Sequence, residues 1–268
     1  MRVAALQMNS GADVAANLAL ADRLMGEAAA DGCGLVVLPE NFALMPERGR
    51  DKAKHAEQPG DGPIQSFLSD AAKKHGLWII AGSMPLASPD PERVYGACPV
   101  VDDQGETRAM YRKIHLFDVD IPDSGQSYRE SDSMYPGDEP VHVETPAGIV
   151  GLTICYDVRF PELYRRLVDA GATLFTVPAA FTVPTGRAHW HTLLKARAIE
   201  NLSYVIAPGQ FGEHPDNRST YGHSLIVGPW GNVLAELESG NGFIAADVDA
   251  DLVARLRRDA PVLANRRL

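Results

Sequence analysis

The sequence predicts an α/β protein built as a four-layer α-β-β-α sandwich with two mixed sheets. Short apolar segments, typical of buried strands, alternate along the chain with segments whose apolar residues recur at helical spacing. Several of the predicted strands are separated only by short turn sequences, and such neighbours pair as antiparallel hairpins. Strands joined both by helices and by hairpins form mixed sheets, so we expect helices on the outer faces of two packed sheets.

The first half of the chain contains a helix–strand alternation followed by a hairpin. Gly32 ends the first helical segment, and Pro39 ends the strand that follows it. Residues 102–105 (DDQG) are typical of a hairpin turn. Residues 114–140 are rich in Asp, Ser, Gly and Pro, and we expect them to form a long loop, which in a compact domain is usually functional or disordered. The predicted strands are 3–8, 35–38, 77–84, 94–101 and 107–112, and the predicted helices are 13–30 and 64–75.

The second half repeats the alternation and ends on a helix. The predicted strands are 141–144, 149–154, 174–177, 204–207, 225–227, 233–237 and 242–248, and the predicted helices are 163–170, 185–201 and 249–258. No internal repeat, low-complexity segment or linker-like change in composition divides the chain. We therefore predict a single domain over residues 1–268.

Composition excludes several classes of partner. The net charge of −10 disfavours binding to nucleic acid and to anionic membranes. The three cysteines are widely spaced and odd in number, which argues against a disulfide framework or a C-x-x-C site. The chain shows neither a signal-peptide pattern near its beginning nor an apolar segment of membrane-spanning length. We expect a cytoplasmic protein.

Three polar residues follow predicted strands directly. Cys155 ends an apolar run and precedes a polar stretch, as at a sharp turn between strand and helix, although an isolated cysteine is more often a core residue. Glu40 lies at the carboxyl end of a buried strand, where ligand sites gather in open α/β sheets. Lys113 also ends a strand, but a lone lysine is usually a solvated surface charge.

The surroundings of these residues resemble a known family. Residues 38–42 (LPENF), 111–117 (YRKIHLF) and 154–162 (ICYDVRFPE) are similar to the three signature blocks of the nitrilase (carbon–nitrogen hydrolase) superfamily, in the family's order. The resemblance covers essentially the whole chain. Residues 181–190, 195–201 and 221–224 are similar to the branch that contains deaminated glutathione amidase and omega-amidase, from which Arg187 and His191 depart.

The resemblance implies hydrolysis of a small carboxylated amide to an acid and ammonia through a cysteine thioester. Cys155 would be the nucleophile and Glu40 the general base and acid. Lys113 and the backbone N–H of Tyr156 would stabilise the oxyanion, and the lysine cation would also favour the thiolate. Glu130, with Asp132 as a weaker match, would orient Lys113 and bind the amide nitrogen or the water. No cofactor is implied, and no residues have the sequence spacing of a metal site.

Further expectations concern the substrate and the assembly. A guanidinium close to the nucleophile can grip a carboxylate, so Arg159 is a candidate substrate-binding residue, with Arg187 as a second. An ion pair of Arg159 with Glu162 or Asp157 is an equally good reading. The resemblance adds Phe181 and Thr182 as substrate-binding residues. It also implies a homodimer, or a higher homo-oligomer, formed through the helix after Cys155 and the C-terminal tail. Apolar residues suited to that contact are Leu163, Tyr164, Leu167 and Val168 on the helix and 261–263 in the tail.

Other functions stay open within and outside this family. Omega-amidase activity on alpha-keto-acid amides, N-carbamoyl amidase activity and nitrilase activity all use the same chemistry. A catalytically inactive binding protein of the same fold is the alternative from another class. The presence together of Glu40, Lys113 and Cys155 argues against it.

Overall fold

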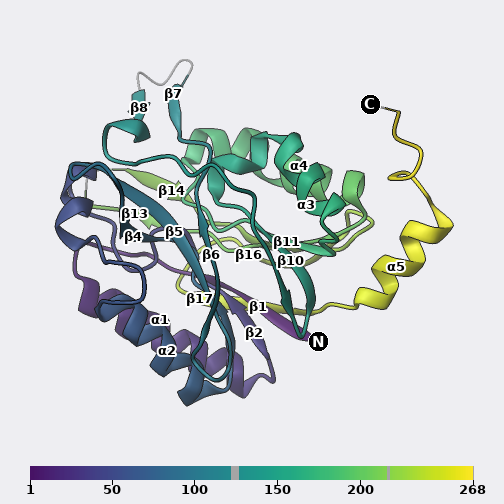
Figure 1. Cartoon of the computed structure of the whole chain (residues 1–268), viewed down its shortest axis with the longest axis horizontal. Coiled ribbons are helices and arrows are strands. Elements are labelled where there is room, and N and C mark those ends of the chain that lie inside the picture. Colours follow the sequence, from purple (N-terminus) through teal and green to yellow (C-terminus); the bar gives the residue numbers. More distant parts are fainter. Residues whose placement is uncertain (122–126, 216–217, 268) are drawn as a thin grey trace.

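The computed structural model describes residues 1–121, 127–215 and 218–267. Its helices are α1 (Val14–Ala30), α2 (Pro63–His75), α3 (Pro161–Asp169), α4 (Val183–Asn201) and α5 (Ala250–Asp259), with 3-10 segments η1 (Gly49–His55), η2 (Glu130–Asp132) and η3 (Cys155–Arg159). Figure 1 shows α1 and α2 on one outer face of two stacked sheets, and α3 and α4 on the other. This arrangement confirms the predicted four-layer α-β-β-α sandwich. Within the described residues, no helix has the length and apolar character needed to span a bilayer.

The first sheet is mixed. Its strand order is β17 (Gly242–Asp247), β1 (Arg2–Gln7), β2 (Leu35–Val37), β3 (Trp78–Ile80), β5 (Val94–Val101) and β4 (Met84–Ala87), with β6 (Thr107–Arg112) also paired to β5. The central strands β1, β2 and β3 are parallel to one another. The flanking pairs β1–β17, β3–β5, β4–β5 and β5–β6 are antiparallel.

The second sheet repeats this plan. Its order is β16 (Val233–Leu237), β15 (Ser224–Val227), β12 (Tyr204–Ala207), β11 (Leu174–Thr176), β10 (Gly148–Leu152) and β9 (His142–Thr145). Strands β10, β11 and β12 are parallel, and the outer pairs are antiparallel. Two small hairpins, β7 (Asp118–Asp120) with β8 (Ser127–Arg129) and β13 (Phe211–Glu213) with β14 (Ser219–Tyr221), complete the strands.

Alternating side chains of β1 serve two separate parts of the core. Val3 and Ala5 belong to the apolar cluster that joins the two sheets, with Leu152 on the opposite sheet. Ala4 and Leu6 belong to the cluster beneath α1 and α2. Both faces of the strand are therefore buried, which explains why the sequence shows a continuous apolar run there instead of an apolar–polar alternation.

The predicted strand 77–84 is interrupted, and the interruption supports the site. The chain turns at Gly82, whose φ of 59° favours glycine. A Cβ at Gly82 would lie 2.0 Å from the carbonyl oxygen of Pro39, so only glycine allows this close approach. Next to it, the Ser83 hydroxyl accepts a hydrogen bond from the backbone N–H of Asn41 at 2.8 Å. The turn thus holds the segment that carries Glu40.

The predicted loop 114–140 is not wholly irregular. It contains the β7–β8 hairpin and η2, whereas residues 122–126 of that loop lie outside the described residues. Strands of three residues with polar side chains give no periodic signal in the sequence, so this hairpin was not predicted.

The apolar residues of α3 are not available to a partner. Leu163, Tyr164, Leu167 and Val168 are all buried in the core of this chain, which contradicts their predicted role as contact surface. Their helical spacing arises because this face of α3 packs against the protein's own sheet. The tail differs, because the segment after α5 projects beyond the sheets at the right of Figure 1, and Val262 in it is exposed.

Candidate functional site

A cavity of about 260 Å³ lies where the two sheets meet. Glu40 follows β2 of the first sheet, and Cys155 follows β10 of the second. Lys113 follows β6, and Glu130 begins η2. All four side chains line this cavity, so the structure brings together residues that are far apart in the sequence. The carboxyl ends of parallel strands from both sheets converge there, which is where ligand sites gather in open α/β sheets.

Cys155 is held in a strained turn. Its φ of 48° places a non-glycine residue in the left-handed region. Its backbone N–H donates to the carbonyl oxygen of Pro178 at 2.8 Å, and η3 begins at this residue. The strand therefore ends abruptly, and the buried Cys155 also lines the cavity.

Asp157 fixes this turn from behind. The side chain is fully buried, and one of its oxygens accepts hydrogen bonds from the Tyr111 hydroxyl at 2.7 Å and the backbone N–H of Ile154 at 2.8 Å. The other oxygen accepts from the backbone N–H of His115 at 3.1 Å and contacts its Nδ1 at 2.7 Å. The His115 ring also stacks on Phe160. His115 is thus part of the support of the turn and does not line the cavity.

Lys113 lies between two carboxylates. Its Nζ donates to Glu40 Oε1 at 2.7 Å and to Glu130 Oε1 and Oε2 at 2.8 and 2.9 Å. Glu130 Oε2 also accepts from the backbone N–H of Phe117 at 2.6 Å, which orients the carboxylate. The Lys113 side chain is only 2% exposed, so the ammonium is enclosed by these partners. Asp132, the weaker match in the sequence, does not line the cavity.

The charges of this cluster stabilise one another. Burial raises the pKa of Glu40, but the ammonium of Lys113 outweighs burial and holds the pKa below its ordinary value. Burial lowers the pKa of Lys113, but the charges of Glu130 and Glu40 outweigh burial and raise the pKa well above its ordinary value. Both groups are therefore ionised at neutral pH. A buried ion pair without such partners would be costly.

The thiol of Cys155 is protonated in this arrangement. Burial raises the pKa of Cys155 well above its ordinary value, and the negative charge of Glu40 raises it further. Lys113 lowers it, but by less. The lysine thus favours the thiolate, as expected, but burial and the charge of Glu40 outweigh its effect in the protein without substrate. Glu40 and Lys113 are thus the charged groups that act most strongly on the thiol.

The other predicted site residues divide into two groups. Tyr156, Phe181 and Thr182 line the cavity. Arg159 does not line it, but its guanidinium lies over the rings of Tyr156 and Phe181 at 5.8 and 5.6 Å and contacts Nδ1 of His189 at 3.3 Å. The alternative for Arg159 was an ion pair with Glu162 or Asp157. Among the described residues Arg159 forms neither pair. Arg187 is exposed and lies outside the cavity lining.

Three basic residues that the sequence analysis missed also line the cavity: Lys52, Arg129 and Arg218. Lys52 is 9% exposed, and its Nζ donates to Asn41 Oδ1 at 2.8 Å. Burial lowers the pKa of Lys52 to about 8. Apart from Gly49 and Ala53 the residues of η1 are polar, so no pattern marks this lysine as buried. The cavity therefore offers positive charge besides Lys113.

Comparison with known proteins identifies the family. The pattern of the family described as "Carbon-nitrogen hydrolase" matches residues 2–258. Deaminated glutathione amidase from Yersinia enterocolitica is 40% identical over 99% of this chain and 92% of that protein. The Homo sapiens protein of the same name is 41% identical over 99% of this chain and 82% of that protein.

Solved structures agree. The C. elegans NitFhit protein superposes with a TM-score of 0.92 at 38% identity, covering 99% of this chain and 65% of that chain. Saccharomyces cerevisiae Nit3, described as a member of branch 10 of the nitrilase superfamily, superposes with a TM-score of 0.89 at 31% identity, covering 100% of this chain and 97% of that one. Because the family pattern and these relatives span nearly the whole sequence, the chain belongs to the carbon–nitrogen hydrolase family of the nitrilase superfamily.

Proposed function

We propose that this protein is an amidase that hydrolyses a small carboxylated amide through a thioester on Cys155, and that its substrate is deaminated glutathione. The observation that carries the chemistry is the cluster in which Glu40 and Lys113 lie close to the thiol and Glu130 holds the Lys113 ammonium. The substrate is supported by the relatives named deaminated glutathione amidase. An amidase from Nesterenkonia sp. AN1, 28% identical, is described with acrylamide added at its active-site cysteine.

Acylation begins with transfer of the thiol proton. Glu40 accepts this proton as the sulfur of Cys155 attacks the amide carbonyl. Because the two events occur together, no free thiolate has to form first. The tetrahedral oxyanion is stabilised by the ammonium of Lys113 and the backbone N–H of Tyr156. Protonated Glu40 then gives its proton to the leaving nitrogen, the C–N bond breaks, and a thioester remains on Cys155.

Deacylation uses the same groups in reverse. Glu40 takes a proton from water, and the resulting hydroxide attacks the thioester. Collapse of the second tetrahedral intermediate breaks the C–S bond and returns the proton to the sulfur. Glu130 keeps Lys113 in place through both steps, because its two oxygens hold the ammonium at 2.8 and 2.9 Å.

We assign recognition of the substrate carboxylate to Lys52 in preference to Arg159. Lys52 lines the cavity and has three N–H donors, one of which is directed to Asn41. Arg159 is separated from the cavity by the rings on which it lies. An ammonium in a buried position attracts a carboxylate more strongly than one in water, since the local dielectric constant is lower.

The test compares two amides of equal size, one with a carboxylate and one with a neutral group in its place. We expect the wild-type protein to prefer the carboxylated amide, and Lys52→Met to raise KM for that amide while sparing the neutral one. Cys155→Ala serves as the inactive control. Preference of the wild-type protein for the neutral amide would overturn the proposed substrate class. Retained turnover by Cys155→Ala would overturn the mechanism.

The released product separates the candidate substrates. Deaminated glutathione contains secondary amides, so its hydrolysis releases an amine and not the ammonia expected from the sequence, whereas primary alpha-keto-acid amides release ammonia. Assays of both products with both substrates distinguish deaminated glutathione amidase activity from omega-amidase activity. A larger kcat/KM for the primary amide would favour omega-amidase.

We also propose a cytoplasmic, single-domain protein that forms homodimers. All three cysteines are free thiols, which is typical of reducing compartments. One apolar cluster contains residues of both sheets, which favours a single domain. The tail after α5 extends from the body and carries exposed Val262, so a second copy is a suitable partner for it.

A further inference from the structure

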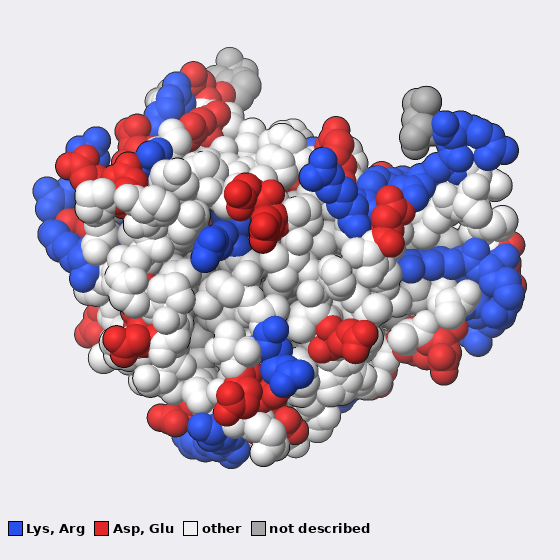
Figure 2. Space-filling view, viewed as in Figure 1, with Lys and Arg blue, Asp and Glu red and all other residues white. Residues whose placement is uncertain are grey.

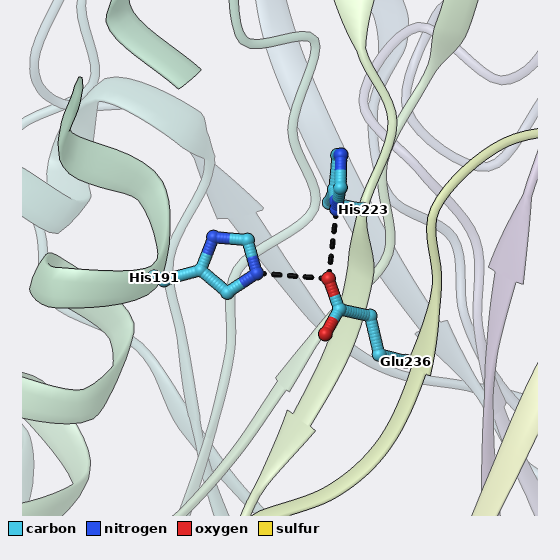
Figure 3. A group of neighbouring side chains, drawn as sticks. All are labelled: His191, His223 and Glu236. Atoms are coloured by element: carbon cyan, nitrogen blue, oxygen red, sulfur yellow. Dashed lines mark hydrogen bonds and ion pairs between the residues drawn. The ribbon is translucent and has the colours of Figure 1, made fainter. Parts of the chain in front are cut away.

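Two histidines and a glutamate meet on the surface, outside the lining of the catalytic cavity. Figure 3 shows His191 from α4, His223 from the segment before β15 and Glu236 from β16 directed toward one another. Glu236 Oε1 lies 2.8 Å from His191 Nε2 and 2.7 Å from His223 Nδ1. None of the three lines the catalytic cavity. His191 is one of the residues that depart from the family resemblance.

The three side chains are positioned by their surroundings. The His223 ring stacks on Tyr221 with centroids 4.1 Å apart, and its carbonyl oxygen accepts a hydrogen bond from Trp190 Nε1 at 2.8 Å. Its backbone is left-handed, with a φ of 51°. Glu236 is held by the pairing of β16 with β15, opposite Leu225. The groups therefore come from rigid elements, and little order has to be created when a ligand binds.

We propose that His191, His223 and Glu236 form a binding site for a divalent transition-metal ion, with Zn²⁺ as the best fit. Two imidazoles and one carboxylate are a ligand set that zinc accepts, with water in the fourth position. The potential ligand atoms all lie within 4.8 Å of one another. Side-chain exposures of 32%, 21% and 29% leave access for the ion and for that water.

The two distances to Glu236 require only a small adjustment. Ligand atoms around tetrahedral zinc are about 3.3 Å apart, given metal–ligand bonds of about 2.0–2.1 Å. The present N–O distances of 2.7 and 2.8 Å must therefore open by about half an ångström, which side-chain rotation can supply. Neutral histidines would move their N–H to the other ring nitrogen and offer a lone pair to the ion.

The charge of Glu236 suits this role. Its carboxylate partly offsets the charge of a divalent cation. The bound ion would join α4 to the β15–β16 hairpin. Since Thr185 at the start of α4 and Thr220 in β14 line the catalytic cavity, the ion would stabilise one wall of that cavity.

The experiment measures metal binding directly. Cys155→Ala is the parent protein, because this substitution removes the cavity thiol as a competing zinc ligand. After treatment with a chelator, the protein is titrated with ZnCl₂ against a chromophoric indicator, and Co²⁺ is added to a second sample for its visible spectrum. Three ligand variants are made in the parent: His191→Gln, His223→Asn and Glu236→Gln. Asparagine is chosen at 223 because it tolerates the left-handed backbone.

We expect the parent to bind one zinc ion per chain and to give the absorption of four- or five-coordinate Co²⁺. Each ligand variant should lose affinity by more than about a hundredfold, since even partners outside the ligand shell change affinity by 10- to 100-fold. Zinc should raise the Tm of the parent and leave that of the variants unchanged. His142→Gln, at an exposed histidine of β9, is the matched control and should bind like the parent. Unchanged zinc affinity in all three ligand variants, or no binding by the parent at millimolar zinc, would overturn the proposal.

Discussion

Two buried lysines in one cavity have opposite pKa shifts. Lys113 is enclosed by two carboxylates, which outweigh burial and raise its pKa. Lys52 has no carboxylate within hydrogen-bonding distance among its described partners, so burial dominates and lowers its pKa to about 8. The first lysine therefore keeps its charge over the whole physiological range, whereas the second loses it in mildly alkaline solution.

This difference predicts an alkaline change in substrate binding. Because the lowered pKa keeps Lys52 charged below about pH 8 and neutral above it, KM for a carboxylated amide should rise above about pH 8. KM for a neutral amide should not follow. Steady-state kinetics of both substrates between neutral and alkaline pH measure the effect. The rise should vanish in Lys52→Met, and its persistence in that variant would assign it to another group.

A second prediction concerns the general base. The pKa of Glu40 lies below its ordinary value of 4.5. We therefore expect kcat/KM to decline on the acid side only at pH values below 4.5, where Glu40 becomes protonated. Glu40→Gln should lower kcat by about 10²- to 10⁴-fold, the usual contribution of a positioned proton acceptor. Combining it with Cys155→Ala should add little, because the two groups act together. An additive loss would indicate that they work in separate steps.

Asp157 should act on the nucleophile without contacting the substrate. Asp157→Asn places an amide where hydrogen-bond donors from Tyr111 and Ile154 now converge. We expect the free energy of unfolding to fall by about 1–3 kcal/mol. We also expect kcat to fall, because the turn that positions Cys155 loses its support. Thermal unfolding and kinetics measure both. Asp103→Asn, at an exposed position, is the control and should change neither. Unaltered kcat with lowered stability would limit Asp157 to a structural role.

Sequence reasoning found some residues of the cavity and missed others for a physical reason. Glu40, Lys113 and Cys155 lie just after strands, where the strand gives way to a polar residue. Each is also surrounded by a sequence that matches a family motif. Lys52 and Arg218 lie on polar segments with no such break. Their approach to the cavity depends on contacts between segments distant in sequence, which single-sequence patterns do not contain.

At the scale of elements, α4 approaches β14 through a glycine. A Cβ added at Gly186 would lie 2.3 Å from Cγ of Tyr221. Alanine improves helix propensity by about 1 kcal/mol, but overpacking costs about 1–3 kcal/mol, so Gly186→Ala should be destabilising overall. Displacement of α4 should also raise KM, because Thr185 lines the cavity.

Chemical denaturation and kinetics of Gly186→Ala test this close approach. Gly26→Ala in α1 is the comparison, since its Cβ would meet only the end of the His75 side chain, at 3.1 Å. We expect a smaller change in stability there and no change in KM. Equal effects of the two substitutions would mean that the contact with Tyr221 adjusts without cost.

Element length decided which parts of the fold could be predicted. The long helices α1, α2 and α4 and the paired strands β5 and β6 agree with their predicted positions within two residues. The three-residue strands of the β7–β8 and β13–β14 hairpins were missed, because three residues cannot display a period. The strand predicted over 77–84 was wrong at Gly82, where tertiary contact with Pro39 overrides local propensity.

At the scale of the whole molecule, the C-terminal segment carries charge opposite to that of the rest. Residues 250–268 contain five arginines and two aspartates, although the chain has a net charge of −10. Figure 2 shows Lys and Arg side chains gathered on this projecting segment at the right. A basic arm that extends from an acidic body is suited to contact with a second copy.

Removal of residues 260–268 should therefore shift the protein from dimer to monomer. Light scattering at micromolar concentration, before and after the truncation, measures the mass. The truncation also removes the exposed ion pair of Arg266 with Asp169, whose contribution to stability is at most about 1 kcal/mol. Asp169→Asn removes this pair alone and should leave the mass unchanged. A monomeric mass for the full chain would contradict the proposed assembly.

The meeting of two sheets at the catalytic cavity has a consequence for biosynthesis. Glu40 and Lys113 belong to the half of the chain that emerges first from the ribosome, and Cys155 to the half that emerges later. Strand β17, which is among the last elements, returns to pair with β1. Until β17 has emerged, a nascent chain thus lacks the β1–β17 pair of its first sheet, although Glu40, Lys113 and Cys155 have already been synthesised.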